Sequence, residues 1–172
     1  MSGNRIPLFS EADIAARVDI IAREIANSAV KPEIMAPILV GAFVFAADLL
    51  RALARQGLIL PTEFLWLRSY AARESAADVS VLAGPSPLVR GRTVLIVDGV
   101  LDRGRTIAKA KALLLQAGAS ATLTAVAVDK SRKDAVAAAD FAAFVGVEGF
   151  IVGYGMDDAG AGRGLPGISV MP

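Results

Sequence analysis

The sequence contains neither cysteine nor histidine among its 172 residues. Without cysteine the chain can form no disulfide, no thiolate nucleophile and no zinc–thiolate site, which agrees with a reducing cytoplasm. Without histidine it has no Ser-His-Asp triad, no imidazole metal ligand and no histidine general base. Acid–base chemistry therefore falls to carboxylates, lysine or tyrosine, and we expect a carboxylate to act as the base.

A charge excess of either sign and long apolar runs are also missing. The net charge is +1 at pH 7, so nothing in the overall charge favours nucleic acid or an anionic membrane as a partner. Residues 1–7 lack the apolar core of a signal peptide, and no apolar stretch approaches the roughly 18 residues that span a bilayer. We expect a soluble cytoplasmic protein with a single domain over residues 1–172, since typical domains contain roughly 100–200 residues.

Helical and strand-like patterns alternate along the chain. Apolar residues recur every three or four positions from Ile14 to Ile25, and Ser10 with Asp13 forms a weak capping box before them, which predicts a helix. Apolar runs predict strands at residues 34–40, 64–70, 94–97, 122–129, 140–145, 150–153 and 168–171, with further helices at 43–56 and 107–117. This alternation predicts an α/β fold with a mostly parallel central sheet flanked by helices on both faces. Ligands of such sheets bind at the carboxyl ends of the strands.

Two segments do not follow a simple pattern. Pro37 lies inside an expected strand and lacks a backbone N–H, so it stands at a strand end or leaves a gap in the ladder. Residues 71–90 contain small and polar side chains and the cluster Gly84-Pro85-Ser86-Pro87. We expect a mobile excursion there, such as a two-stranded flap, rather than packed core.

The stretch 93–106 concentrates the polar chemistry of the chain. Its apolar run is followed by Asp98 and Asp102, and then by an Arg-Gly-Arg-Thr turn that leads into a helix. Free amides at a helix N-terminus bind anions, whereas carboxylates do not hold phosphate. We therefore expect the turn to take a phosphate and the carboxylates to face sugar hydroxyls, a metal ion or a reacting base. The alternative is an ordinary strand-to-helix turn that Thr106 caps.

Residues 94–106, VLIVDGVLDRGRT, resemble the phosphoribosyl-pyrophosphate loop of the type I phosphoribosyltransferases. The segments ILVGAF (38–43), SY (69–70), VDK (128–130) and FIVGYGMD (150–157), in that order, resemble hypoxanthine-guanine phosphoribosyltransferases, and the similarity covers nearly the whole chain. The resemblance implies the fold of that family, with a small hood and a mobile flap at about 70–91. It also implies a purine salvage enzyme that uses Mg²⁺ and is a homodimer or homotetramer.

For the acidic side chains, the resemblance implies separate roles. Asp102 would handle the proton on N7 of the purine, Asp98 would contact the ribose hydroxyls and magnesium, and Asp157 would reach a second magnesium ion. The implied contacts with phosphoribosyl pyrophosphate are Asp98, Asp102, Arg103, Gly104, Arg105 and Thr106.

The resemblance also implies how the purine is selected. Lys130 would donate to O6 and so select a 6-oxopurine over adenine, because a fixed donor rejects a partner that leaves it unpaired. Phe150 would stack on the purine and Ile151 would present backbone groups to its edge. The remaining implied contacts are Val40, Gly41 and Arg163 for pyrophosphate, and Ser69 and Tyr70 in the flap. Considered alone, these residues have ordinary alternatives in solvated side chains, helix caps and core packing.

The chain departs from the family pattern at four positions, one of which is Ala71, where a glycine is common. Gly99 stands where a second acid is usual, Val40 replaces a lysine and Arg103 replaces a threonine. The leading hypothesis is an enzyme that converts hypoxanthine or guanine and phosphoribosyl pyrophosphate to the nucleotide and pyrophosphate. Gly99 and Val40 support the alternative, a non-catalytic relative that senses a nucleotide or phosphoribosyl pyrophosphate. A third hypothesis is a type I transferase that acts on another base, such as xanthine or a pyrimidine.

Overall fold

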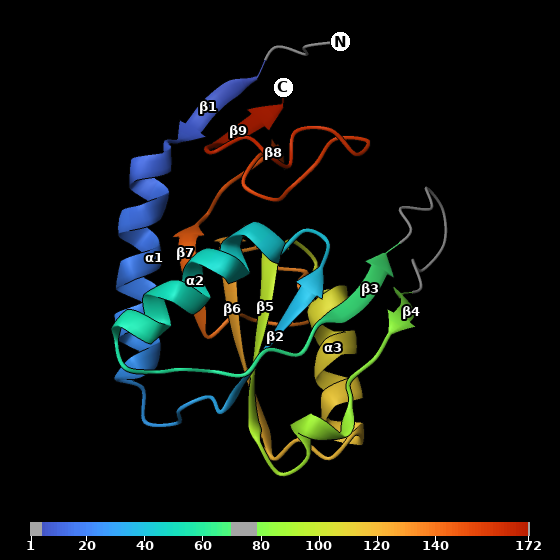
Figure 1. Ribbon diagram of the computed structural model, residues 1–172. Coiled ribbons are helices and arrows are strands. Elements are labelled where there is room, and N and C mark those ends of the chain that lie inside the picture. Colours follow the sequence, from blue (N-terminus) through green and yellow to red (C-terminus); the bar gives the residue numbers. More distant parts are fainter. Residues whose placement is uncertain (1–4, 70–78, 172) are drawn as a thin grey trace.

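A six-stranded sheet forms the centre of the molecule (Figure 1). The computed structural model describes residues 5–69 and 79–171. The strands of this sheet are β2 (Ile34–Leu39), β3 (Leu65–Ser69), β4 (Val79–Ala83), β5 (Thr93–Leu101), β6 (Ala121–Asp129) and β7 (Phe141–Val145). Their order is β4-β3-β2-β5-β6-β7, with every neighbouring pair parallel except β3 and β4. The predicted, mostly parallel α/β sheet is confirmed.

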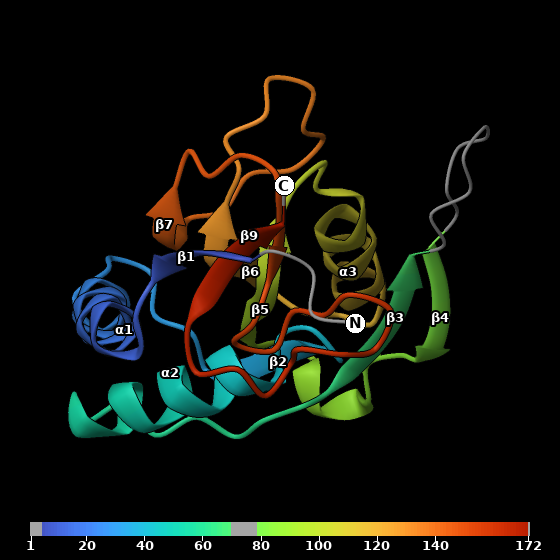
Figure 2. The ribbon, with the colours of Figure 1, turned by 90° about the horizontal axis from the view of Figure 1, so that it is seen from above.

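Helices cover both faces of this sheet, as predicted. The helices are α1 (Glu11–Ala26) and α2 (Phe43–Arg55) on one face and α3 (Arg105–Gln116) on the other (Figure 2). In β5, Leu95 and Val97 pack in the core cluster that includes α1 and α2, whereas Val94 and Ile96 pack in the cluster that includes α3. Successive side chains of a strand point to opposite faces, so a strand covered on both sides requires an uninterrupted apolar run.

Helix α1 begins where the sequence predicts. The backbone N–H of Asp13 donates to Ser10 Oγ at 3.2 Å, and the backbone N–H of Ser10 donates to Asp13 Oδ2 at 2.9 Å. The capping box is therefore complete, and a cap of this kind stabilises a helix by about 0.5–2 kcal/mol. The buried side chains of the helix are Ile14, Val18, Ile21, Ala22 and Ile25.

Pro37 lies inside β2, and the ladder has a gap beside it. The backbone of Met35 bonds to the 61–63 segment, with N–H to Pro61 O at 2.9 Å and the N–H of Glu63 to Met35 O at 2.8 Å. Because alternate residues of a strand face the same neighbour, Pro37 faces that side too. Pairing with β3 resumes only at Ile38. The missing N–H therefore falls where no ladder bond is made, which is one of the two expected outcomes.

A second, smaller sheet lies above the carboxyl edge of the central one (Figure 1), and we call it the hood. It contains β1 (Ile6–Phe9), β8 (Phe150–Val152) and β9 (Ile168–Met171) in the antiparallel order β1-β9-β8. The last two strands were predicted, but β1 was not. Its four residues pair with the opposite end of the chain, and Phe9 stacks on Phe144 at 3.7 Å between ring centroids. Local pattern cannot reveal such a distant partner.

In the second half of residues 71–90 the structure shows a two-stranded element, as expected, but two of its residues are part of the packed core, which was not expected. Strand β4 joins the central sheet beside β3, and a short 3-10 helix follows it at Pro87–Val89. Val79 and Val89 are buried in the core cluster that includes α3. The other residues from 80 to 90 are exposed or partly exposed. The rest of the expected flap, residues 70–78, lies outside the described residues.

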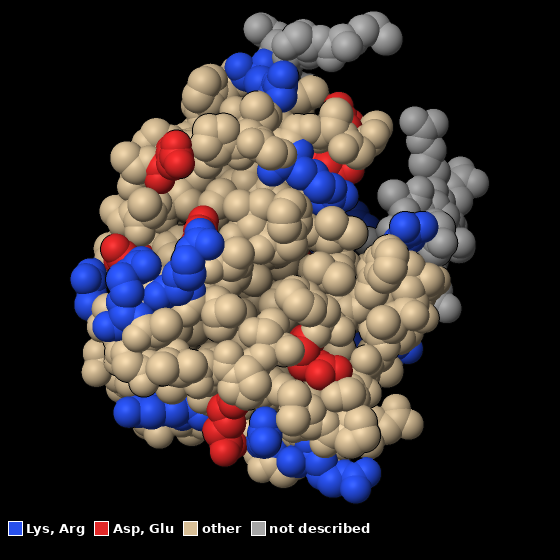
Figure 3. Space-filling view, viewed as in Figure 1, with Lys and Arg blue, Asp and Glu red and all other residues tan. Residues whose placement is uncertain are grey.

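Two surface properties bear on possible partners. Among the described residues, no helix is both long and apolar enough to cross a membrane. On the face shown in Figure 3, basic and acidic side chains are interspersed. Ion pairs of exposed side chains include Arg51–Asp48 and Arg55–Asp19. Large parts of that face carry no charged side chain of either sign.

Candidate active site

A cavity of about 490 Å³ opens at the carboxyl ends of the parallel strands, between the central sheet and the hood. Trp66 and Met156 contribute to its wall, and no local sequence signal marks them as site residues. The predicted site residues that line it are Val40, Gly41, Asp98, Asp102, Thr106, Lys130, Phe150, Ile151, Asp157 and Arg163. Residues separated by more than 100 positions thus share one cavity, because parallel strands bring their carboxyl ends to one edge and the hood and its loop lie over that edge.

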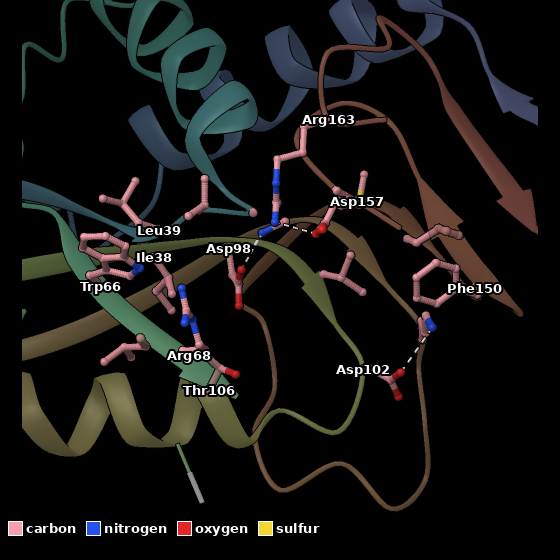
Figure 4. A pocket seen from close by; sticks show the side chains of 18 residues that line it. Ile38, Leu39, Trp66, Arg68, Asp98, Asp102, Thr106, Phe150, Asp157 and Arg163 are labelled. Carbon is pink, nitrogen blue, oxygen red and sulfur yellow. Dashed lines mark hydrogen bonds and ion pairs between the residues drawn. The ribbon is translucent and has the colours of Figure 1, made fainter. Parts of the chain in front are cut away.

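The labelled side chains are distributed along the cavity in a definite order (Figure 4). Phe150 and Asp102 lie at one end, and Leu39 and Trp66 lie at the other. Asp98 lies between the two ends. A ligand that fills the cavity would thus have an aromatic partner at one end, a carboxylate near its middle and the 39–41 segment at the far end.

The turn before α3 is built to bind an anion. Gly104 is the N-cap and has φ +74°, and a Cβ atom at this position would lie 2.8 Å from the backbone nitrogen of Ala137. Only glycine fits this tight approach. No side chain caps the helix, so its first amides remain available to an anion, and Thr106 lines the cavity beside them.

The two arginines of this turn are not part of the cavity wall. Arg103 and Arg105 are exposed and do not line the cavity. Arg103 Nε lies 3.8 Å from Oδ2 of Asp134, in the loop after β6, and the Arg103 backbone carbonyl accepts a bond from Val136 N–H at 2.9 Å. Arg103, which replaces the usual threonine, therefore ties the turn to its neighbouring loop.

Asp102 lies between two basic side chains. Lys130 Nζ is 3.2 Å from Asp102 Oδ2, and Arg132 Nε is 3.3 Å from Oδ1. Oδ1 is buried and makes no aligned hydrogen bond, so it keeps the capacity to accept a proton or an N–H donor. The side chain of Asp102 is 46% exposed, and ion pairs this exposed contribute about 0–1 kcal/mol. A ligand can therefore replace Lys130 here at small cost. The sequence analysis did not single out Arg132, although it follows Lys130 by two positions.

Asp98 lies in the wall of the cavity, and its carboxylate accepts a hydrogen bond from the backbone. The N–H of Gly99 donates to Asp98 Oδ1 at 2.7 Å. Burial raises the pKa of Asp98 to about 7, although the bond from Gly99 opposes the shift. A cation at this position would stabilise the ionised carboxylate and remove much of the desolvation penalty.

The loop after β8 positions an acid and a base together. Arg163 Nη2 lies 2.5 Å from Asp157 Oδ1, and Nη1 donates to the carbonyl of Gly155 at 2.7 Å. Asp157 Oδ2 also accepts from the N–H of Gly160 at 2.6 Å. These bonds hold the guanidinium at the cavity, where it could pair with a second anion.

Within residues 5–69 and 79–171, no three acidic side chains converge to hold a metal ion by themselves. Asp98 and Asp157 do line the same cavity. Mg²⁺ in phosphate-binding sites is commonly held by one or two carboxylates together with the substrate's phosphates and water. The available carboxylates therefore fit a magnesium ion that arrives with a phosphorylated substrate.

At the far end of the cavity, the Leu39–Val40 peptide bond is cis. Val40 is 41% exposed, and Gly41 follows it at the start of the turn into α2. Of the two predicted flap residues, Ser69 and Tyr70, the structure describes only Ser69. Ser69 is the last residue of β3 and pairs with Val79, while Tyr70 lies outside the described residues.

At the opposite end, Phe150 and Ile151 differ in burial. Phe150 is 51% exposed, whereas Ile151 is 5% exposed and belongs to the main core cluster. Core packing therefore does not account for Phe150, whose ring is free to stack on a planar ligand. The side chain of Ile151 packs inward, so only its backbone groups are suited to contact a ligand.

The phosphoribosyl transferase domain model matches residues 8–159. The hypoxanthine-guanine phosphoribosyltransferase of Aquifex aeolicus is 34% identical to the chain over 165 residues, which cover 94% of this chain and 91% of the relative. The hypoxanthine phosphoribosyltransferase of Escherichia coli K12 is 30% identical, with 94% and 92% of the two chains covered. Among solved structures, the hypoxanthine phosphoribosyltransferase of Trypanosoma cruzi in complex with its product IMP has a TM-score of 0.85 and 27% identity. That match covers 99% of this chain and 95% of the solved one.

Proposed function

The chain belongs to the hypoxanthine-guanine phosphoribosyltransferases of the type I phosphoribosyltransferase family, and from this premise we propose how its cavity works. It is a purine salvage enzyme that converts hypoxanthine and phosphoribosyl pyrophosphate to IMP and pyrophosphate, and guanine to GMP in the same way. The observation that carries the assignment is the arrangement of one cavity. Phe150, Lys130 and Asp102 line one end of the cavity. The uncapped N-terminus of α3 and Arg163 provide positive charge along the remainder.

The purine would occupy the end formed by Phe150, Lys130 and Asp102. Phe150 stacks on the ring, Lys130 donates to O6, and backbone groups of Ile151 contact the edge. To reach O6, Lys130 exchanges its contact with Asp102, which then faces N7 of the base. The site would reject adenine because its 6-amino group cannot accept the hydrogen bond that Lys130 offers.

The sugar and its phosphates would extend from the purine toward the other end. The 5-phosphate lies at the N-terminus of α3, where Thr106 and the amides after Gly104 receive it. The ribose lies beside Asp98, and the pyrophosphate lies between the 39–41 segment and Arg163. Arg103 and Arg105 add positive charge near the phosphate without lining the cavity.

In the reaction, N9 of the purine bonds to C1 of the ribose as the bond from C1 to pyrophosphate breaks. Asp102 accepts the proton that leaves N7, so the purine ring of the product nucleotide is left uncharged. Asp98 and Asp157 would hold Mg²⁺, which neutralises charge on the departing pyrophosphate. The protein contributes positioning and electrostatic stabilisation rather than a covalent intermediate.

We also propose that the chain acts as one domain in the cytoplasm and as a homodimer or homotetramer. Phe43 and Phe64 are 42% and 52% exposed, and a subunit contact would cover such apolar surface. Light scattering of the purified protein measures the assembly directly, and a monomer at working concentrations would contradict this part of the proposal.

The deciding experiment supplies the protein with Mg²⁺, phosphoribosyl pyrophosphate and one purine at a time. We expect IMP from hypoxanthine, GMP from guanine, and little or no product from adenine; xanthine tests the neighbouring specificity. Binding of phosphoribosyl pyrophosphate without product from any base would reject the enzyme in favour of a sensor, the function that Gly99 and Val40 would allow. Lys133→Gln, an exposed lysine near Lys130, serves as the matched control for variants of the site.

A further inference from the structure

The backbone carbonyl of Gly41 packs against two glycines from other parts of the chain. A Cβ atom added to Gly99 would lie 2.9 Å from Gly41 O, and one added to Gly155 would lie 2.5 Å from the same oxygen. Real Cβ atoms essentially never approach another heavy atom this closely. The Gly41 carbonyl therefore occupies space that exists only because both neighbours lack a side chain. We call this space the carbonyl seat, formed by Gly99 and Gly155.

One wall of the carbonyl seat belongs to the rigid centre of the molecule. Gly99 is part of β5, which pairs with β2 on one side and β6 on the other. It directly follows Asp98 and binds its carboxylate through the backbone N–H. The position of the 39–41 segment is thus set against the same strand that carries the carboxylate of the ribose site.

The other wall belongs to the loop that carries Arg163. The N–H of Gly155 donates to the Arg163 carbonyl at 2.9 Å, and the Gly155 carbonyl accepts from Arg163 Nη1 at 2.7 Å. The preceding residue, Tyr154, is 4% exposed and donates its hydroxyl to Asp48 Oδ2 on α2 at 2.8 Å. This wall is therefore anchored to the helix that begins just after Gly41.

Gly41 itself is not crowded. A Cβ atom added to Gly41 would meet nothing within 4 Å, and its φ is not in the left-handed region. Space is therefore restricted on the carbonyl side of the segment and open around its Cα. The close fit constrains where the segment lies, and this constraint comes from residues 99 and 155 rather than from Gly41.

We propose that Gly99 and Gly155 are positioning residues, which seat the Gly41 carbonyl and so hold the 39–41 segment where it contacts pyrophosphate. This inference rests on the proposed function. It also accounts for the glycine at 99, where relatives of this family usually have a second acid. The Cβ atom of any acid at position 99 would need the volume that the Gly41 carbonyl occupies. In this chain the backbone of the 39–41 segment therefore packs against position 99, where an acidic side chain is usual in the family.

The test is Gly99→Ala, which adds one methyl group at a position without a left-handed φ. We expect the KM for phosphoribosyl pyrophosphate and the Kd for magnesium pyrophosphate to rise about tenfold, which corresponds to about 1.4 kcal/mol. The KM for hypoxanthine should change less than twofold by the same reasoning. Gly84→Ala is the matched control, since Gly84 is exposed, has only an ordinary contact at 3.8 Å and lies outside the cavity lining.

Two further variants keep the test decisive. Gly155→Ala approaches the seat from the hood side and should show the same loss, but Gly155 has φ +98°, so this variant also strains the backbone and supports the result from Gly99→Ala without replacing it. Circular dichroism of each variant, measured at the temperature of the binding experiment, shows that it is folded before its constants are compared. Gly99→Asp restores the usual acid and should also weaken phosphoribosyl pyrophosphate binding. The proposal is overturned if Gly99→Ala leaves both constants unchanged, or if Gly99→Asp tightens binding. Because magnesium pyrophosphate binding needs no turnover, the result stays separate from failure of the wild-type protein to form nucleotide.

Discussion

The side-chain nitrogen of Lys130 lies 3.2 Å from Oδ2 of Asp102, although the two residues are 28 positions apart. The parallel register of β5 and β6 produces this contact. Leu101 stands opposite Asp129, and the backbone N–H of Lys130 donates to the Leu101 carbonyl at 3.0 Å. Both side chains therefore follow directly from paired strand ends, which brings them into contact with each other.

Replacing Lys130 with methionine removes the donor for O6 while keeping much of the apolar stem. We expect kcat/KM for hypoxanthine to fall about 10- to 100-fold, because hydrogen bonds to charged groups contribute about 1.5–3 kcal/mol. Discrimination against adenine should fall with it. Steady-state kinetics with both bases measure this, and Lys133→Gln is the control. Retained discrimination in Lys130→Met would remove Lys130 from base selection.

Asp102→Asn preserves shape but removes the proton acceptor. We expect kcat to fall about 10²- to 10⁴-fold, the usual contribution of a general base. Phosphoribosyl pyrophosphate should still bind, because the helix N-terminus and Arg163 are unchanged. Turnover and calorimetric binding, measured on the same preparation, separate the two effects. Unchanged turnover would show that the N7 proton leaves by another route.

The buried carboxyl of Asp98 predicts a pH dependence of stability in the absence of Mg²⁺. Its pKa is raised from the ordinary value of 3.8 to about 7, so the folded state retains a proton that the unfolded state releases. The free energy of unfolding should therefore decrease as pH rises from about 4 to about 7, by roughly 4 kcal/mol at most.

Asp98→Asn should lack this decrease. Denaturant unfolding at several pH values should show the variant gaining stability relative to the wild type between pH 4 and pH 8. Glu24→Gln, which changes an exposed carboxylate of α1, is the control and should follow the wild-type profile. A constant difference between wild type and Asp98→Asn across this range would contradict the shifted pKa.

The hydrogen bond from Tyr154 to Asp48 joins the hood loop to α2, and its loss should be measurable. Tyr154→Phe removes the hydroxyl alone and should lower the free energy of unfolding by about 0.5–1.5 kcal/mol. The loss of stability should stay in this range because Asp48 keeps its ion pair with Arg51 when the hydroxyl is removed. A double-mutant cycle with Asp48→Asn isolates the bond, and additive effects of the two substitutions would show that it contributes nothing.

Much of the molecule follows from local sequence pattern. The uninterrupted apolar run of β5 predicted a strand covered on both faces, and the spacing from Ile14 to Ile25 with Ser10 before it predicted α1 and its cap. The order of the polar clusters predicted that they meet at the carboxyl edge of a parallel sheet. The strand and the helix depend on residues close together in sequence, and the meeting of the polar clusters follows from the alternation of strands and helices, so the sequence alone was sufficient.

Other properties depended on segments that are distant in sequence. Strand β1 exists because β9 is there to pair with it, and Val79 and Val89 are buried only because their segment lies against the core cluster that includes α3. Arg132 became part of the site only when the loop after β6 folded against Asp102.

Gly99 shows most clearly how a property read from the sequence differs from one that depends on tertiary structure. From the sequence it was only a missing acid beside Asp98. In the folded chain it faces the carbonyl of Gly41, 58 positions earlier, at a distance that excludes any side chain. Steric exclusion of this kind depends on the packing of three separate segments, and only the tertiary structure places them together.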